Sequence, residues 1–238
     1  MASAALTINR LMGPVIKPVL FLLACAPLLK ALAEIGMELF GLGRSSLGAN
    51  PVEELLNRGG IWGLNLLVLT LCVTPLRQLT GWHAIGRVRR MLGLFAFFYL
   101  SLHLTVYLTL DRALEFDTIV EDVLKRPYIT IGFTGLMLLV PLAITSFDAL
   151  RRRMGRAWQR LHFLVYVVVL LGLWHYFWQV KKDIANPLIY AAVVALLLGW
   201  RIYRHWRQKQ QLALRSAATD AAAPMAFDGG NPTAERLG

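Results

Sequence analysis

The sequence predicts an all-α integral membrane protein, a bundle of six transmembrane helices with both termini in the cytoplasm. Hydrophobic residues make up 57% of the 238 residues and charged residues only 16%, whereas a soluble domain carries about 25% charged residues. Apolar stretches of about 18–20 residues, long enough to cross a lipid bilayer, recur along the chain. The formal net charge is +11, but the basic residues cluster in short connections between these stretches. The bilayer is therefore the expected environment, and no nucleic-acid partner is expected.

The connections between the predicted spans alternate in charge. The spans are residues 15–35, 60–77, 91–110, 128–147, 161–180 and 186–203. Arginines crowd the second and fourth connections and basic residues follow the last span, whereas the third connection, residues 111–122, is acidic. Because lysine and arginine are enriched in cytoplasmic connections, the second and fourth connections and both termini are placed in the cytoplasm. No internal repeat is evident.

The two ends of the chain carry separate predictions. Basic residues precede an apolar stretch that ends near residues 31–33, a pattern that also describes a cleavable signal peptide. Pro27 and Lys30 crowd the end of this stretch, which favours a retained first span. We predict a transmembrane domain over residues 1–207 and a disordered cytoplasmic tail over residues 208–238, which are rich in Ala, Ser, Asp and Gly.

Cys25 and Cys72 fall inside apolar spans and form no C-x-x-C motif. This pattern excludes covalent c-type haem and an all-cysteine iron–sulfur cluster. We expect both to be small buried hydrophobic residues.

Three histidines, His103, His162 and His175, lie inside apolar spans, where an ionisable side chain is a functional candidate. Histidine is also a common axial ligand of haem iron. His103 lies 13 residues beyond Arg90, and His175 lies 15 residues beyond Arg160. At 1.5 Å per residue this puts them about 20 and 22 Å above the basic ends of two parallel helices. The matching depth predicts that these two imidazoles bind the two axial faces of one haem iron.

His162 lies only two residues beyond Arg160, near the cytoplasmic interface, and is a candidate ligand of a second haem. No histidine stands at the same level on the third span, so His83, an arginine or a water molecule are the alternatives for the opposing ligand. On an ideal helix, His162 and His175 point about 140° apart, so two haems need different positions around the fifth span or a distorted helix. Hydrogen-bonded packing or a proton relay remains open for His103 and His175, and a snorkelling side chain at the membrane interface remains open for His162. The neighbouring aromatic residues suit haem walls and interfacial belts equally.

Two stretches of the chain resemble the ferric-reductase-like transmembrane family. The stretch Arg-Arg-Met-Leu-Gly-Leu at residues 89–94 and the stretch Trp-Gln-Arg-Leu-His at residues 158–162 are similar to its third-helix and fifth-helix motifs. These motifs continue into Tyr99, His103, Tyr107, Asp111, Tyr166 and His175. The resemblance covers roughly residues 10–205. Within the family, the chain length and the single histidine on the third span most resemble the haem-binding membrane subunits of bacterial periplasmic methionine-sulfoxide reductase systems.

The resemblance implies a b-type cytochrome of the bacterial inner membrane that binds one or two b-type haems and FMN. The implied iron ligands are His103, His175 and His162, and no catalytic residue is implied on this subunit. The implied function is to relay electrons from the quinone pool, or from a flavin donor, to a soluble periplasmic molybdopterin enzyme that reduces methionine sulfoxide in oxidised proteins. Larger family members carry two histidines on the third helix and a cytoplasmic FAD/NADPH domain. This chain has neither, so its electrons are expected from quinol or a separate flavoprotein.

Two other classes of protein remain open. A proton-coupled membrane transporter would use the intramembrane histidines as a relay, and its spans would be expected to carry more Asp or Glu than this sequence has. A non-catalytic membrane scaffold would tolerate replacement of all three histidines. An absorption spectrum of the purified protein tests the cytochrome class against the other two, because only the cytochrome is coloured.

Overall fold

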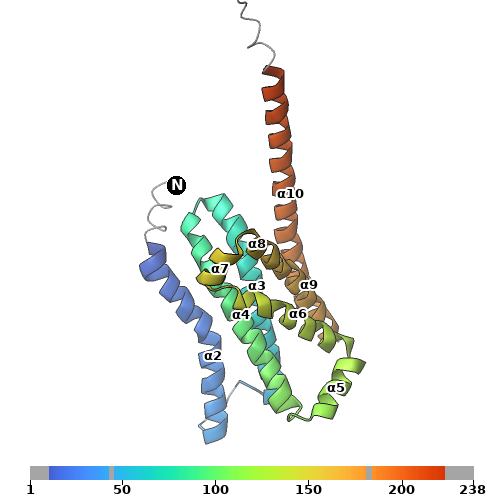
Figure 1. The fold of residues 1–238 in the computed structure, drawn as a ribbon. Helices are drawn as coiled ribbons and strands as arrows, with labels where there is room; N and C mark the ends of the chain where they lie inside the picture. The colour runs from blue at the N-terminus through green and yellow to red at the C-terminus, as the bar shows by residue number, and fades with distance from the viewer. Residues whose placement is uncertain (1–10, 43–45, 181–183, 223–238) are drawn as a thin grey trace, which may run out of the picture. The chain divides into compact units, whose positions relative to one another are not determined.

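The protein is helical throughout the part of the chain that the computed structural model describes, residues 11–42, 46–180 and 184–222 (Figure 1). In chain order the helices are η1 (Met12–Ile16), α2 (Lys17–Phe40), α3 (Pro51–Thr80), η2 (His83–Ile85), α4 (Gly86–Val106), η3 (Tyr107–Asp111), α5 (Phe116–Lys125), α6 (Pro127–Ile144), α7 (Asp148–Met154), α8 (Arg156–His162), α9 (Leu164–Gln179) and α10 (Ala185–Ala222). Six helical stretches are long and apolar enough to cross a membrane, which confirms the predicted all-α fold with six spans. These stretches are Gly13–Phe40, Pro51–Thr80, His83–Asp111, Pro127–Ile144, Arg156–Gln179 and Ala185–Thr219.

Local turn chemistry sets the ends of the central helix α3. The Asn50 side chain accepts a hydrogen bond from the Glu53 N–H at 3.3 Å, and Pro51 occupies the first turn, where its missing N–H costs nothing. At the other end Gly81 adopts a left-handed conformation, with φ of 71°, which a residue without a Cβ adopts freely. The 30-residue helix is long enough to carry groups for two separate sites.

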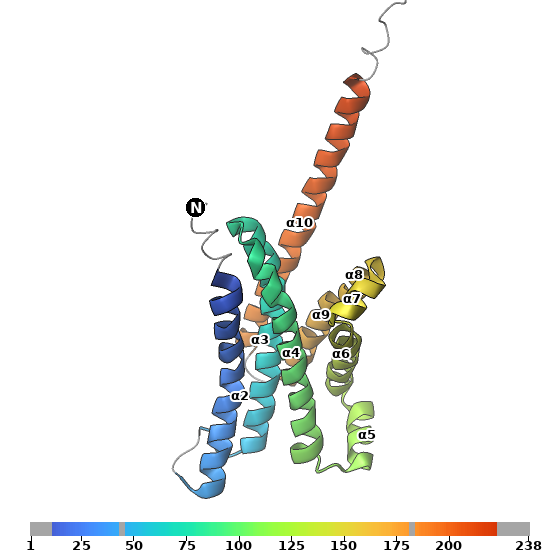
Figure 2. The same cartoon turned by 60° about the vertical axis from the view of Figure 1, so that its left-hand side comes forward.

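Two helix pairs form the bundle within residues 11–194. α3 packs along α4, α6 packs along α9, and the two pairs meet through α4 with α6 and α3 with α9 (Figure 2). Buried aliphatic side chains fill the interior, among them Leu67, Leu71, Val88, Val168 and Val169. Many other large apolar side chains are exposed on the helices, as expected of a surface that faces hydrocarbon chains rather than water.

The helix α2 joins the bundle through Tyr99 on α4. The buried Tyr99 hydroxyl donates to the Ala24 carbonyl at 2.7 Å and accepts from the Leu28 N–H at 3.1 Å. These are the two groups that pair with each other in a regular helix, so the hydroxyl is inserted into the hydrogen-bond ladder beside Pro27. Tyr99 therefore contacts α2. Although it lies only four residues before His103 in the sequence, it does not line the histidine site.

Several connections that the sequence analysis treated as loops contain helices. The acidic connection 111–122 includes most of α5, and the arginine-rich connection 151–160 consists largely of α7 and α8. Both are too short to show a reliable apolar period, which is why the pattern of spans did not reveal them. We call the end of the bundle that carries α5 the α5 end, and the opposite end the α7–α8 end.

The last helix, α10, continues through Ala222. Residues 208–222 are therefore helical, although the sequence analysis predicted disorder from residue 208. Alanine, leucine, glutamine and arginine dominate this segment, and they favour helix where no glycine or proline interrupts the chain. Residues 195–222 belong to a second compact unit. Residues 223–238 of the predicted tail lie outside the described residues.

Candidate functional site

His103 on α4 and His175 on α9 lie close together inside the bundle. Their ring centroids are 6.2 Å apart and their planes are nearly perpendicular, at 81°. The two histidines that the depth argument placed at the same level thus come from two different helix pairs and meet where these pairs face each other.

A backbone carbonyl fixes the orientation of each imidazole. His103 Nδ1 lies 2.9 Å from the Leu56 oxygen on α3, and His175 Nδ1 lies 2.6 Å from the Tyr128 oxygen on α6. A carbonyl oxygen only accepts hydrogen bonds, so Nδ1 carries the proton in both rings. In the neutral imidazole, Nε2 then keeps its lone pair. Each ring therefore offers Nε2 as a metal ligand, with a hydrogen-bonded Nδ1 of the kind that metal-binding histidines usually have.

Two glycines make room for these imidazoles. A Cβ on Gly60 would lie 3.4 Å from His103 Nδ1, and a Cβ on Gly132 would lie 2.7 Å from His175 Nδ1. Gly60 stands four residues after Leu56 and Gly132 four residues after Tyr128, on the turn that follows each accepting carbonyl. The absent side chains let the rings reach the backbone of the neighbouring helix.

Both histidines line a cavity of about 820 Å³, which we call the large cavity. Its volume lies within the range of about 300–1,000 Å³ that is usual for cofactor and ligand sites. Most of its wall is aliphatic, with Leu64, Leu100, Leu136 and Val168 among the lining residues. The cavity therefore suits a large and mainly apolar group.

The spacing of the imidazoles fits one metal ion between them. A bond from a metal to an imidazole nitrogen is about 2 Å long, so two imidazoles on opposite sides of one ion have centroids about 6 Å apart. The observed separation is 6.2 Å. The donor set of two neutral histidines, the free Nε2 atoms and the apolar cavity together fit a haem held by His103 and His175.

A polar cluster closes the large cavity at the α5 end. The buried Asp122 of α5 accepts a hydrogen bond from the Tyr107 hydroxyl at 3.0 Å. It also pairs with Arg112 at 2.7 Å and with Arg126 at 3.0 Å. Tyr107, Arg112 and Arg126 all line the cavity. Asp122 thus fastens α5 across the polar end of the cavity.

His162 lies apart from this pair, in a second cavity of about 440 Å³, which we call the small cavity. The Trp158 ring stacks on the His162 ring with centroids 3.8 Å apart, and His162 Nδ1 lies 3.1 Å from the Trp158 carbonyl on its own helix. α8 ends at His162 and α9 begins at Leu164. The helix is thus interrupted between His162 and His175, and a distorted helix is one of the two arrangements that the angular argument left open for two haems.

The small cavity is basic. Arg77, Arg89, Arg90 and Arg151 line it, and no aspartate or glutamate is among its described lining residues. Asp148 nearby pairs with Arg90 at 2.6 Å, and the hydrogen bond from this guanidinium holds the pKa of the Asp148 carboxyl below its usual range. The cavity is therefore suited to an anionic group such as a phosphate or a carboxylate.

No second histidine faces His162 across the small cavity among its described lining residues, and His83 does not line it. The arginine alternative stays open, because Arg89 and Arg90 share this cavity with His162.

The aromatic residues near the histidines are divided between the sites. Tyr107 and Tyr176 line the large cavity and Tyr166 lines the small one.

The two helix pairs repeat one arrangement with an offset of 72 residues, although no internal repeat was expected. Each accepting carbonyl is separated by 47 residues from its histidine. Adding 72 to a residue number in the first half gives its equivalent in the second half. The equivalent pairs are Leu56 and Tyr128, Gly60 and Gly132, Gly63 and Gly135, and His103 and His175. It also places Arg90 at the position equivalent to His162. Comparing the chain with itself at this offset is the signal that would have revealed the two glycines, which the sequence analysis missed.

Comparisons with known proteins identify relatives of this chain. A sequence model of the family described as "Ferric reductase like transmembrane component" matches residues 59–173, which include His103 and His162 and end two residues before His175. A Xanthomonas campestris protein is 52% identical over 179 residues, which cover 75% of this chain and 82% of the relative. An Azospira oryzae protein is 48% identical over 214 residues, covering 89% of this chain and 88% of the relative. Both relatives are named protein-methionine-sulfoxide reductase heme-binding subunit MsrQ.

Proposed function

This chain belongs to the ferric-reductase-like transmembrane family and, within it, to the MsrQ haem-binding subunits of methionine-sulfoxide reductases, and we propose that it is a b-type cytochrome that relays electrons across the bacterial inner membrane. The observation that carries this proposal is the His103–His175 pair, with centroids 6.2 Å apart in an apolar cavity. When bound, the haem supplies a one-electron couple between ferric and ferrous iron.

The residues of the chain would hold and orient a haem in the large cavity. His103 and His175 offer their Nε2 atoms as iron ligands, and the carbonyls of Leu56 and Tyr128 keep both rings in the ligating tautomer. The mainly aliphatic wall of the large cavity would shield the bound group from water. A haem held there by two histidines of the chain would supply electron transfer rather than bond-making on a substrate.

We place the electron input at the α7–α8 end, which the arginine-rich connections assign to the cytoplasm together with both termini. The donor is quinol from the membrane or a reduced flavin. The basic small cavity supports a site there for the phosphate of FMN, and His162 is the candidate iron ligand if a second haem is bound instead. Measurement of the haem-to-protein and FMN-to-protein ratios of the purified protein would show which of these two groups is bound.

We place the electron output at the α5 end, on the periplasmic side. The acceptor in this proposal is a periplasmic molybdopterin methionine-sulfoxide reductase subunit, MsrP. This proposal is supported by the names of the relatives, which describe them as subunits of a protein-methionine-sulfoxide reductase. The reduced partner then repairs methionine sulfoxide in oxidised proteins.

Visible absorption spectra of the purified protein, oxidised and then reduced with dithionite, test the proposal. The wild type should show the spectrum of a low-spin b-type haem with two histidine ligands. His103→Ala and His175→Ala should each abolish it, while Cys72→Ser, which changes a side chain outside both cavities, should leave it unchanged. A colourless wild type would overturn the cytochrome proposal, and an unchanged spectrum in either histidine variant would contradict the ligand assignment.

A further inference from the structure

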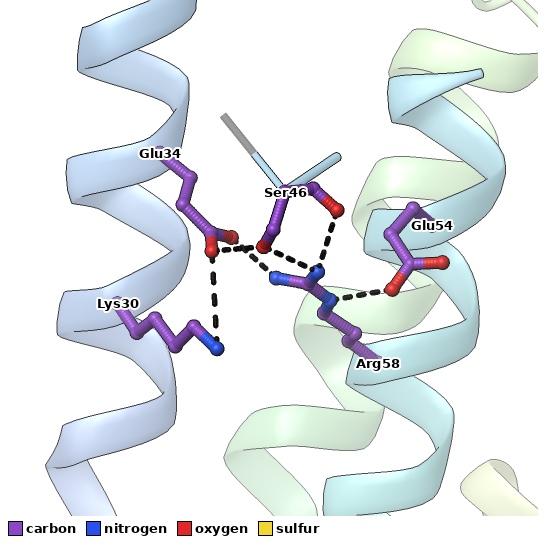
Figure 3. A network of polar contacts seen from close by, with 5 residues as sticks. All are labelled: Lys30, Glu34, Ser46, Glu54 and Arg58. Atoms are coloured by element: carbon purple, nitrogen blue, oxygen red, sulfur yellow. Dashed lines mark hydrogen bonds and ion pairs between the residues drawn. The ribbon is translucent and has the colours of Figure 1, made fainter. Parts of the chain in front are cut away.

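The Arg58 side chain joins three parts of the chain at the start of α3 (Figure 3). Its guanidinium donates to the Glu34 carboxylate on α2 and, through Nη2, to the carbonyl and hydroxyl oxygens of Ser46 at 3.0 Å each. Its Nε donates to Glu54 at 2.7 Å, and the Ser46 hydroxyl donates to Glu34. We call Glu34, Ser46, Glu54 and Arg58 the Arg58 clamp.

The clamp is buried where it meets α2. Glu34 is only 4% exposed, whereas most of the described side chains of α2 are exposed or half-buried. A buried carboxylate persists only when it is paired and hydrogen-bonded, and here the Arg58 guanidinium and the Ser46 hydroxyl meet that need. Apart from the Tyr99 contact, this is where α2 is held most specifically to the bundle.

The same turn of α3 holds His103. Leu56, two residues before Arg58, supplies the carbonyl that accepts from His103 Nδ1, and a Cβ on either Gly59 or Gly60 would lie 3.4 Å from His103 side-chain atoms. The residue equivalent to Arg58 at the 72-residue offset is Thr130, which donates to the Val123 carbonyl. The two histidines are therefore supported differently.

We propose that the Arg58 clamp is a positioning device for His103, in which Glu34 and Arg58 fix the α3 turn that carries the Leu56 carbonyl. This inference rests on the proposed function. A firm hydrogen bond from Nδ1 makes the ligating nitrogen more basic, and a more basic ligand stabilises ferric over ferrous iron. The clamp thus lowers the reduction potential of the haem, and α2, which precedes the matched residues 59–173, is part of the haem site.

Potentiometric titration of the haem spectrum tests the proposal on three purified variants. Glu34→Gln removes the carboxylate. Arg58→Lys keeps the positive charge but cannot form the same fork of hydrogen bonds, and Arg58→Gln removes both the charge and the fork. Each should raise the midpoint potential, because each loosens the Leu56 carbonyl. Lys30→Gln is the matched control, since Lys30 lies 3.9 Å from the same Glu34 carboxylate without contacting α3 in the network (Figure 3), and its potential should stay at the wild-type value.

The sign of the shifts separates positioning from charge. If these residues act on the iron only through their charges, Glu34→Gln raises the potential, Arg58→Gln lowers it and Arg58→Lys leaves it unchanged, and this pattern would overturn the proposal. Unchanged potentials in all variants would also overturn it. Failure of the proposed function is distinguishable, because the wild type would then bind no haem. If Arg58→Gln does not fold, the charge-conserving Arg58→Lys decides alone.

Discussion

At the scale of single residues, the tautomer of the two candidate ligands is set by main-chain atoms. Many metal-binding histidines donate to a carboxylate, which leaves a further charge to be neutralised. Here Leu56 and Tyr128 supply uncharged carbonyl oxygens, which suits an interior where an unpaired charge is costly. Substitution of the Leu56 or Tyr128 side chain leaves the backbone carbonyl in place. The hydrogen bonds to the two imidazoles are therefore better tested by substituting the glycines beside the rings, Gly60 and Gly132.

Gly132→Ala should displace the His175 ring. The added Cβ would lie 2.7 Å from Nδ1 and 2.9 Å from Cε1 of the ring, closer than side-chain carbons approach, and overpacking of this kind costs about 1–3 kcal/mol. We expect a loss of most of the low-spin haem spectrum at unchanged protein yield. Gly60→Ala, whose Cβ would lie 3.4 Å from the His103 ring, should have a smaller effect.

Gly36→Ala is the control for these variants. Gly36 lies on α2 and lines neither cavity, and outside its own turn of helix no heavy atom lies within 4 Å of the place that its Cβ would take. Its haem spectrum should match that of the wild type. Equal haem loss in Gly132→Ala and Gly36→Ala would show that the effect comes from any glycine-to-alanine change in a span rather than from the clash with the imidazole.

At the scale of helices, one buried carboxylate makes several of the polar contacts that attach α5. Asp122 accepts a hydrogen bond from the Tyr107 hydroxyl and forms ion pairs with both Arg112 and Arg126. Loss of the negative charge of Asp122 therefore leaves these two cations without their common partner. Asp122→Asn should destabilise α5 by about 1–3 kcal/mol. Hydrogen–deuterium exchange should show faster exchange of the α5 amides, with the α3 and α9 amides unchanged.

Glu121→Gln provides the comparison on the same helix. Glu121 pairs with Lys125 at the surface, and exposed pairs contribute about 0–1 kcal/mol. The α5 amides should therefore keep their wild-type exchange rates in this variant. Fast exchange in both variants, or in neither, would contradict the assigned role of Asp122.

The sequence predicted the spans because apolar length is a strong signal, and it predicted the shared depth of His103 and His175 because helical rise is constant. It did not predict α5, whose ten residues are held by the Asp122 contacts rather than by an apolar stripe of span length. It also missed Gly60 and Gly132, because a glycine in an apolar span carries no sign of which side chain approaches it. Only packing between helices decides that.

At the scale of the whole molecule, the charge asymmetry of the bundle is the basis of the proposed orientation, with the two ends on opposite sides of the membrane. The small cavity with its four arginines lies at the α7–α8 end, whereas the buried Asp122 and the acidic residues 115, 117 and 121 lie at the α5 end. The proposed direction of electron flow depends on this orientation, since input and output sites differ.

Reporter fusions should confirm the orientation. Alkaline phosphatase, which is active only outside the cytoplasm, should be active when fused after Asp117 and inactive when fused after Arg153 or at the C-terminus. Green fluorescent protein should be fluorescent at the last two positions. Active phosphatase after Arg153 would place the arginine-rich end in the periplasm and reverse the proposed topology.

The 72-residue offset between the helix pairs has a consequence for how this molecule can evolve. Two identical hairpins assembled as a homodimer would be forced to present the same side chain at each symmetry-related position. Joining them in one chain removes that constraint, so each half can diverge alone. His103 and His175 are identical, whereas the position 13 residues before each of them is Arg90 in one half and His162 in the other. A single polypeptide thereby holds one matched and one unmatched pair of positions.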